Sequence, residues 1–480
     1  MSTRRLLAVV VIMIFIGGCT FHQQWRKNLE VCKITTSSSP DSSNPECENA
    51  TVQELEGDSA YQIGFVEFND QGEVFDRDQM NFVLDGIYQK AAKNDLIMVV
   101  FVHGWQHRAK GDDGNIVTFR KVLEGISKTE HRQAATESRK PREVVGVYVG
   151  WRGLSLKIPG LKHLLTFWDR KNTAAKVGGG EVSVVLSKIE LIKRTRDAMV
   201  RGERIDQTKK HCGQQGASTC LTDIEHATKT KSQTRLVVIG HSFGGLVVQS
   251  AIDQILIDRA VRTVGDEFGY QSEIEGFGNL VVLINPAFEA QRYTPLFKLE
   301  TDRKSYQQDQ LPVQLILTSR ADWATTYAFP IGRAVSSSFE KKGWSARNLQ
   351  AVGHYTPFIT HHLSRPSKEL GLTPAVEKCS KQPSSIAQAW MAGDKLGQDQ
   401  IIAGLALHRD QLSERAPFLN VSVSGDLISG HNDLDSPPVI EFVKGMIDLA
   451  AITDMEKARI ANQAATLQGL MNSRDLDCLQ

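Results

Sequence analysis

The sequence predicts an α/β protein in which helices cover both faces of an open, mostly parallel, doubly wound sheet. Short apolar runs recur along the chain, as in parallel strands that are buried on both faces. Segments with helical apolar spacing separate most of these runs, and strands that alternate with helices favour this layered arrangement. The expected strands are 61–68, 96–102, 144–149, 236–239, 280–284, 313–317 and 418–423.

Residues 1–18 are expected to be a targeting signal and not part of the fold. Two arginines precede an unbroken apolar run over 6–16, which is too short to span a bilayer comfortably. The run ends in Gly-Gly-Cys19, which resembles the lipobox of bacterial lipoproteins. This resemblance implies that Cys19 is lipidated and anchors the protein in the cell envelope. Thr20 favours the outer membrane, and a plain signal peptide or signal anchor is the alternative.

Residues 19–58 are expected to form the lipidated end and a flexible tether, because 36–49 is rich in Ser and Pro and poor in apolar residues. An α/β domain is expected over 59–455. Within it, 154–168 is apolar and amphipathic, and is either a lid over the site or a helix packed on the sheet. An insertion over 364–416 is expected to contain a helix at about 386–409, and a helical tail is expected over 456–480.

Six cysteines remain besides Cys19, and export to an oxidising compartment makes disulfides plausible. Proximity along the chain suggests Cys32–Cys47 and Cys212–Cys220, which leaves Cys379 and Cys478. Six thiols allow fifteen pairings, so the connectivity stays open.

The strand at 236–239 leads into Gly240-His241-Ser242-Phe243-Gly244, and a helical run follows. A Gly-x-Ser-x-Gly turn between a buried strand and a helix presents the serine hydroxyl at the positive end of the helix dipole. The segment resembles the nucleophile turn of the α/β-hydrolase superfamily, and the resemblance extends over roughly 60–450. It implies an α/β-hydrolase fold with inserted lid segments and Ser242 as the nucleophile.

A serine hydroxyl needs a base, and the base needs an acid that orients it; in this superfamily the acid and then the histidine follow the serine. Asp322 follows the strand at 313–317 and is the preferred acid, because doubly wound sheets place their sites at the carboxyl ends of strands. A turn or helix-capping role is its alternative. Glu289, which follows the strand at 280–284, is the second candidate.

His431 is the preferred base, because it lies between the last strand and the last amphipathic helix, which begins near Pro438. It follows Asp322 by 109 residues, and the insertion accounts for about half of that distance. A competing cluster contains His354, His361 and His362, for which the other interpretation is a structural or substrate-lining role.

The loop His103-Gly104-Trp105-Gln106 follows the strand at 96–102 and resembles the oxyanion loop of the same superfamily. The resemblance implies that the backbone N–H groups of Trp105, or Gln106, and Phe243 stabilise an oxyanion. His103, His107 and His241 are expected to be structural.

The expected function is therefore a membrane-tethered serine esterase or lipase that forms an acyl-enzyme. A thioesterase, an acyltransferase, a peptidase and a non-catalytic binding lipoprotein are the alternatives. The formal net charge of +1 argues against a nucleic-acid partner. Neither a phosphate-binding glycine motif nor metal-ligand spacing points to a cofactor or metal.

Overall fold

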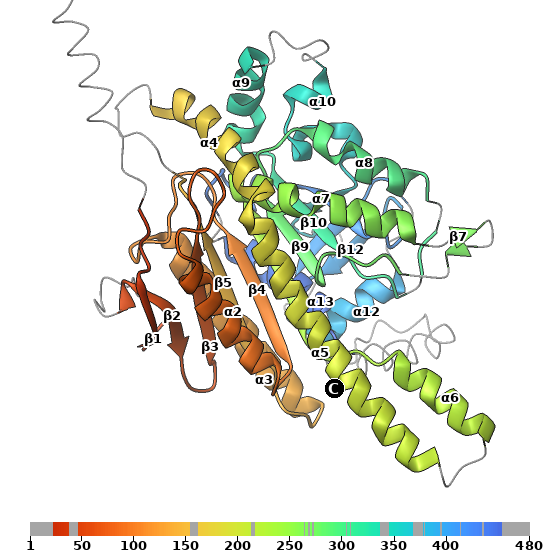
Figure 1. Cartoon of the computed structure of the whole chain (residues 1–480). Helices are drawn as coiled ribbons and strands as arrows, with labels where there is room; N and C mark the ends of the chain where they lie inside the picture. Colours follow the sequence, from red (N-terminus) through yellow and green to blue (C-terminus); the bar gives the residue numbers. More distant parts are fainter. Residues whose placement is uncertain are drawn as a thin grey trace, which may run out of the picture.

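A twelve-stranded, mostly parallel sheet organises the computed structural model (Figure 1). The structure describes residues 23–37, 47–153, 162–212, 217–263, 265–266, 269–270, 273–303, 305–307, 309–336, 345–367, 378, 380–393, 396–412, 414–433 and 436–453. The strand order is β1-β2-β3-β5-β4-β6-β9-β10-β14-β11-β13-β12, and a two-stranded ribbon pairs β7 with β8. All pairs from β3 to β11 are parallel, whereas β2 runs antiparallel to β3 and β13 runs antiparallel to both of its neighbours.

The strands are β1 (Asn28–Ile34), β2 (Ala50–Leu55), β3 (Tyr61–Glu67), β4 (Leu96–Val102), β5 (Glu143–Gly150), β6 (Arg235–His241), β7 (Gly265–Asp266), β8 (Gly269–Tyr270), β9 (Leu280–Ile284), β10 (Gln314–Ser319), β11 (His361–Ser364), β12 (Asp399–Ile402), β13 (Leu405–Arg409) and β14 (Phe418–Val423). The α-helices are α2 (Arg77–Ala91), α3 (Gly114–Thr136), α4 (Lys162–Gly179), α5 (Glu181–Cys212), α6 (Ala217–Thr228), α7 (Phe243–Arg262), α8 (Ala290–Thr301), α9 (Phe329–Ser336), α10 (Ala346–Leu349), α12 (Pro383–Ala392) and α13 (Pro437–Ala450). A π-helical turn, η3 (Ala324–Ala328), and two 3₁₀ turns, η4 (Val352–His354) and η5 (Thr356–Phe358), complete the described elements.

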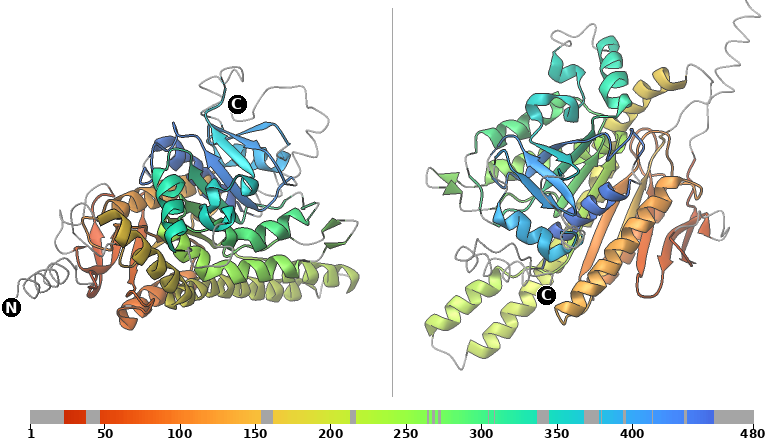
Figure 2. Two further views of the ribbon diagram at one scale, coloured as in Figure 1. Left: turned by 90° about the horizontal axis from the view of Figure 1, so that it is seen from above. Right: turned by 180° about the vertical axis from the view of Figure 1, so that it is seen from behind.

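Two hydrophobic cores lie on opposite faces of the sheet, because successive side chains of a strand point to opposite sides. In β4, Met98 and Val100 belong to the core under α2, α5 and α7, whereas Val99 and Phe101 belong to the core under α3 and α13. The three views show these helices on the two faces (Figures 1 and 2). The α/β class and the seven expected strands are therefore confirmed, with small shifts at their ends.

The prediction of a flexible tether over 19–58 is wrong where the structure describes this segment. Residues 28–34 and 50–55 are β1 and β2, which extend the sheet, and a disulfide joins Cys32 on β1 to Cys47, just before β2. Arg26 is fully buried. The composition of 36–49 suggested a linker, whereas β1 and β2 lie on either side of that stretch.

The expected helix at 386–409 is correct only up to Ala392. Gly393, with φ +88°, ends α12, and residues 399–409 form the hairpin of β12 and β13. Ala403 and Gly404 both adopt positive φ at the hairpin turn, a conformation that reverses a strand and that no helix contains.

The C-terminal half of α5 and the whole of α6 form an arm that extends away from the sheet, whereas the N-terminal half of α5 packs on it (Figure 1). The disulfide Cys212–Cys220 joins the two helices, as proximity suggested. Cys379, Cys478 and the tail at 456–480 lie outside the described residues. No helix among the described residues is both long and apolar enough to cross a membrane.

Candidate active site

Three of the predicted site residues follow strands that end at the same edge of the sheet. Ser242 follows β6, Asp322 follows β10 and His431 follows β14. Parallel strands carry their carboxyl ends to one edge, so these loops meet there although the residues are far apart in sequence. Only β9 lies between β6 and β10, and β14 is the next strand beyond β10.

Ser242 occupies a sharp turn between β6 and α7, with φ 55° and ψ −121°. Such backbone conformations cost of order 1–3 kcal/mol in a residue other than glycine. Close packing enforces this turn: a Cβ at Gly244 would lie 2.1 Å from the carbonyl oxygen of Val102, and one at Gly240 would lie 2.8 Å from that of Gly244. The N–H of Ser242 also donates to Ile284 on β9 at 2.9 Å.

A chain of hydrogen bonds connects the three side chains. Ser242 Oγ lies 2.7 Å from Nε2 of His431, and His431 Nδ1 lies 2.8 Å from Oδ2 of Asp322. Because the carboxylate accepts at Nδ1, the proton of a neutral His431 resides there, and Nε2 is left to accept from the serine hydroxyl. Ser242 is 1% exposed and Asp322 is fully buried.

The carboxyl group of Asp322 is surrounded by donors from the turn that follows it. The N–H groups of Ala324 and Thr325 donate to Oδ1 at 2.9 and 3.2 Å, and the Thr325 hydroxyl donates to Oδ2. Burial alone would raise the pKa of Asp322, but the hydrogen bonds from His431 and Thr325 and the attraction of His431 keep this pKa below its ordinary value. Asp322 is therefore ionised at neutral pH.

Two side chains hold the backbone of His431 in place. The amide Nδ2 of Asn285 and Nε2 of His241 both donate to the carbonyl oxygen of His431 at 3.0 Å. The Oδ1 of Asn285 accepts from the N–H of Ser319 at the end of β10. Asn285 therefore connects the loops after β9, β10 and β14; the only local signal for it is an Asn-Pro pair after a buried strand. Burial, together with repulsion from His431, lowers the pKa of His241 to about 3, so His241 is neutral.

The loop after β4 packs directly on the turn that contains Ser242. A Cβ at Gly104 would lie 2.8 Å from Cβ of Ser242, so only glycine allows this approach. Trp105 is the next residue of this loop, and Phe243 begins α7 directly after Ser242. The N–H of Gln106 donates to the carbonyl oxygen of Gly153 at 3.0 Å. His103 Nε2 accepts from the N–H of Trp151, and burial lowers the pKa of His103 to about 4.

The structure places the second candidates outside this hydrogen-bonded chain. Glu289 forms ion pairs with Lys171, Arg292 and Arg333; burial would raise its pKa, but Lys171 and Arg333 lower it. His354 Nε2 lies 2.8 Å from the Thr325 hydroxyl, behind Asp322.

The other two histidines of the competing cluster lie on β11. His361 pairs with Thr360, and His362 pairs with Asp410. His107 pairs with Asp113.

The lipidation site and the candidate lid lie wholly or partly outside the described residues. Cys19 and residues 154–161 of the candidate lid are not described, and 162–168 are the first turns of α4.

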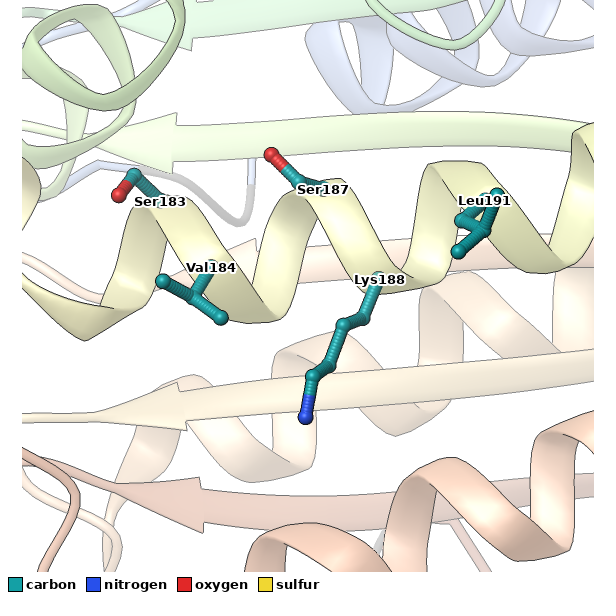
Figure 3. A pocket seen from close by; sticks show the side chains of 5 residues that line it. All are labelled: Ser183, Val184, Ser187, Lys188 and Leu191. Atoms are coloured by element: carbon teal, nitrogen blue, oxygen red, sulfur yellow. The ribbon is translucent and has the colours of Figure 1, made fainter.

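A shallow depression on α5 involves none of the three site residues (Figure 3). It is lined by Ser183, Val184, Ser187, Lys188 and Leu191. Among the described residues, no group of three or more His, Cys, Asp or Glu side chains is arranged to hold a metal ion.

No family model, curated protein or solved structure matches the chain.

Proposed function

We propose that this chain is a membrane-tethered serine hydrolase with an α/β-hydrolase fold that cleaves carboxylic esters through an acyl-enzyme. The hydrogen-bonded chain from Ser242 through His431 to Asp322 carries the proposal. The order of the three residues and their positions after β6, β10 and β14 support the same fold assignment. The Gly-Gly-Cys19 segment supports a lipid anchor in the cell envelope.

In the proposed mechanism, Ser242 Oγ attacks the ester carbonyl carbon while His431 Nε2 takes the hydroxyl proton. Asp322 stabilises the imidazolium that forms. The tetrahedral oxyanion accepts hydrogen bonds from the N–H groups of Trp105 and Phe243, and each such donor is worth about 2.7–4 kcal/mol of transition-state stabilisation. His431 then protonates the leaving alkoxide, and the acyl group stays on Ser242.

Water completes the cycle. His431 takes a proton from the water as it attacks the acyl-enzyme, and the same proton passes to Ser242 Oγ when the carboxylic acid product leaves. The positive end of the α7 dipole stabilises negative charge on the oxyanion. His241 is buried and neutral, so it adds no negative charge that would oppose the oxyanion. A thioesterase, acyltransferase or peptidase would form the same intermediate, and a panel of leaving groups and acceptors separates these chemistries.

A fluorophosphonate probe tests the proposal, because it reacts only with an activated serine. We expect the wild type to be labelled and Ser242→Ala to remain unlabelled. Ser250→Ala is the matched control, since Ser250 lies on the same helix and should leave labelling unchanged. A correctly folded wild-type protein that the probe does not label would refute the proposal.

A further inference from the structure

The segment just after Cys19 is fixed to the edge of the sheet that carries Ser242. The N–H groups of Trp25 and Arg26 donate to the carboxylate of Glu67, the last residue of β3, at 2.9 and 2.8 Å. Arg26 Nε donates to the carbonyl oxygen of Ala109 at 2.9 Å, in the same loop after β4 that places Gly104 against Ser242. The Arg26 guanidinium also lies 3.9 Å from the ring centre of Phe65.

This attachment limits how far the domain stands from its anchor. Six residues lead from Cys19 to Trp25, and even fully extended they span only about 20 Å. A lipid on Cys19 would therefore hold this part of the carboxyl edge of the sheet within about 20 Å of its attachment to the bilayer.

A stripe of exposed apolar side chains lies farther along the same edge, on the other side of Ser242. Trp323, Tyr327 and Ile331 are 65%, 58% and 57% exposed and recur every four residues along η3 and α9, directly after Asp322. The opposite side of these turns is buried through Thr325 and Phe329. Trp and Tyr with an aliphatic neighbour on one face of a short helix are typical of segments that lie in a membrane interface.

Ser242 lies between these two points. Three inter-strand steps separate β3 from β6, and two more lead from β6 to β10. At about 4.8 Å per step, the anchor point and the apolar stripe are about 24 Å apart along the edge, with the nucleophile between them. Figure 1 shows α9 at one end of the molecule and the α5–α6 arm at the opposite end.

We propose that this edge docks on the bilayer that holds the anchor, with Trp323, Tyr327 and Ile331 inserted in the interface, and that the substrate is an ester lipid of that bilayer. The inference rests on the proposed hydrolase activity and the lipid anchor, and it names their substrate class. Water cleaves the acyl ester bond of the lipid, which leaves a fatty carboxylic acid and a lipid alcohol.

The test compares two esters with the full chain reconstituted in vesicles of phosphatidylethanolamine and phosphatidylglycerol. One ester is a fluorogenic acylglycerol in the vesicle, and the other is soluble p-nitrophenyl butyrate. In the variant Trp323→Ser/Tyr327→Ser/Ile331→Ser we expect hydrolysis of the vesicle ester to fall at least tenfold, whereas hydrolysis of the soluble ester stays within twofold.

The matched control removes three equally exposed apolar side chains from α5, α6 and the far end of α7, with Leu191→Ser/Leu221→Ser/Val261→Ser. This control should cleave both esters at the wild-type rate. Equal loss in the two triple variants, no loss in either, or a wild type that cleaves only the soluble ester would overturn the inference. Absence of fluorophosphonate labelling and of both activities would instead refute the proposed function.

A measurement without turnover completes the test. In vesicles that contain dibrominated phosphatidylcholine, we expect quenching of a tryptophan emission component that Trp323→Phe abolishes. Quenching that is identical in wild type and Trp323→Phe would show that Trp323 does not reach the interface.

Discussion

Replacing Asp322 with Asn should abolish turnover by reversing the direction of the hydrogen bonds at His431. Two backbone N–H groups, those of Ala324 and Thr325, donate to Oδ1, so the amide oxygen of Asn must occupy that position. Turning the amide over would leave both donors facing an NH₂ group, at about 1–3 kcal/mol for each unsatisfied donor. The Asn amide nitrogen therefore faces Nδ1 of His431.

The imidazole responds by moving its proton. Nδ1 then accepts from the amide, so the proton moves to Nε2, which points at Ser242 Oγ over 2.7 Å. In that tautomer His431 cannot accept the serine proton. Wrong-tautomer substitutions of this kind lower kcat by about ten-thousandfold, or about 5 kcal/mol in activation free energy.

The assay is the kcat for p-nitrophenyl butyrate, with circular dichroism to establish the fold. Asp426→Asn is the control, since its exposed carboxylate pairs with Arg365 outside the site. A folded Asp322→Asn protein that keeps more than a tenth of the wild-type kcat would show that Asp322 does not orient the base.

Three further predictions concern the supporting structure. His241 and His103, with pKa values of about 3 and about 4, stay neutral in the folded protein, whereas in the unfolded chain both imidazoles take up a proton below about pH 6.5. The unfolding free energy therefore falls as the pH falls, by about 2 kcal/mol for each histidine at pH 5. Equal urea midpoints at pH 7 and pH 5 would contradict this prediction. Gly104→Ala places a methyl group 2.8 Å from Cβ of Ser242 and should lower kcat/KM at least tenfold, whereas Gly114→Ala meets nothing within 4 Å and should have no effect. Cys32→Ser/Cys47→Ser opens a loop of 15 residues and should cost about 3 kcal/mol in unfolding free energy; an unchanged melting temperature would exclude that contribution.

The sequence predicts the central sheet well because strands buried on both faces must be apolar throughout. It predicts β1 poorly, since that strand lies at the edge of the sheet and is mostly exposed, including Leu29 and Val31. It also mistakes the hairpin at 399–409 for helix, because Ile401, Ile402 and Leu405 fit either period and only the turn at Ala403 and Gly404 separates the two.

The residues of the candidate site also differ in how well the sequence predicts them. A local motif predicts Ser242, and positions after strands, together with the order along the chain, predict Asp322 and His431. Asn285 also follows a strand, but its Asn-Pro pair does not indicate a site role, and Thr325 has no local signal. Their role comes from the fold, which places the amide of Asn285 against a carbonyl group 146 residues away. Tertiary contacts of this kind leave no periodic or spacing pattern in the chain.

The bond between Ser242 and His431 also spans 189 positions of the chain, and in the proposed hydrolase this separation sets when activity can begin. β14 must pair with β10 before His431 reaches Ser242, so the last strand that the structure describes completes the site. Contacts of such long range form late, because closing a large loop costs entropy before any contact repays it. If the chain crosses a membrane unfolded, His431 cannot yet act as a base on Ser242. The unfolded chain would then leave the ester bonds of that membrane intact.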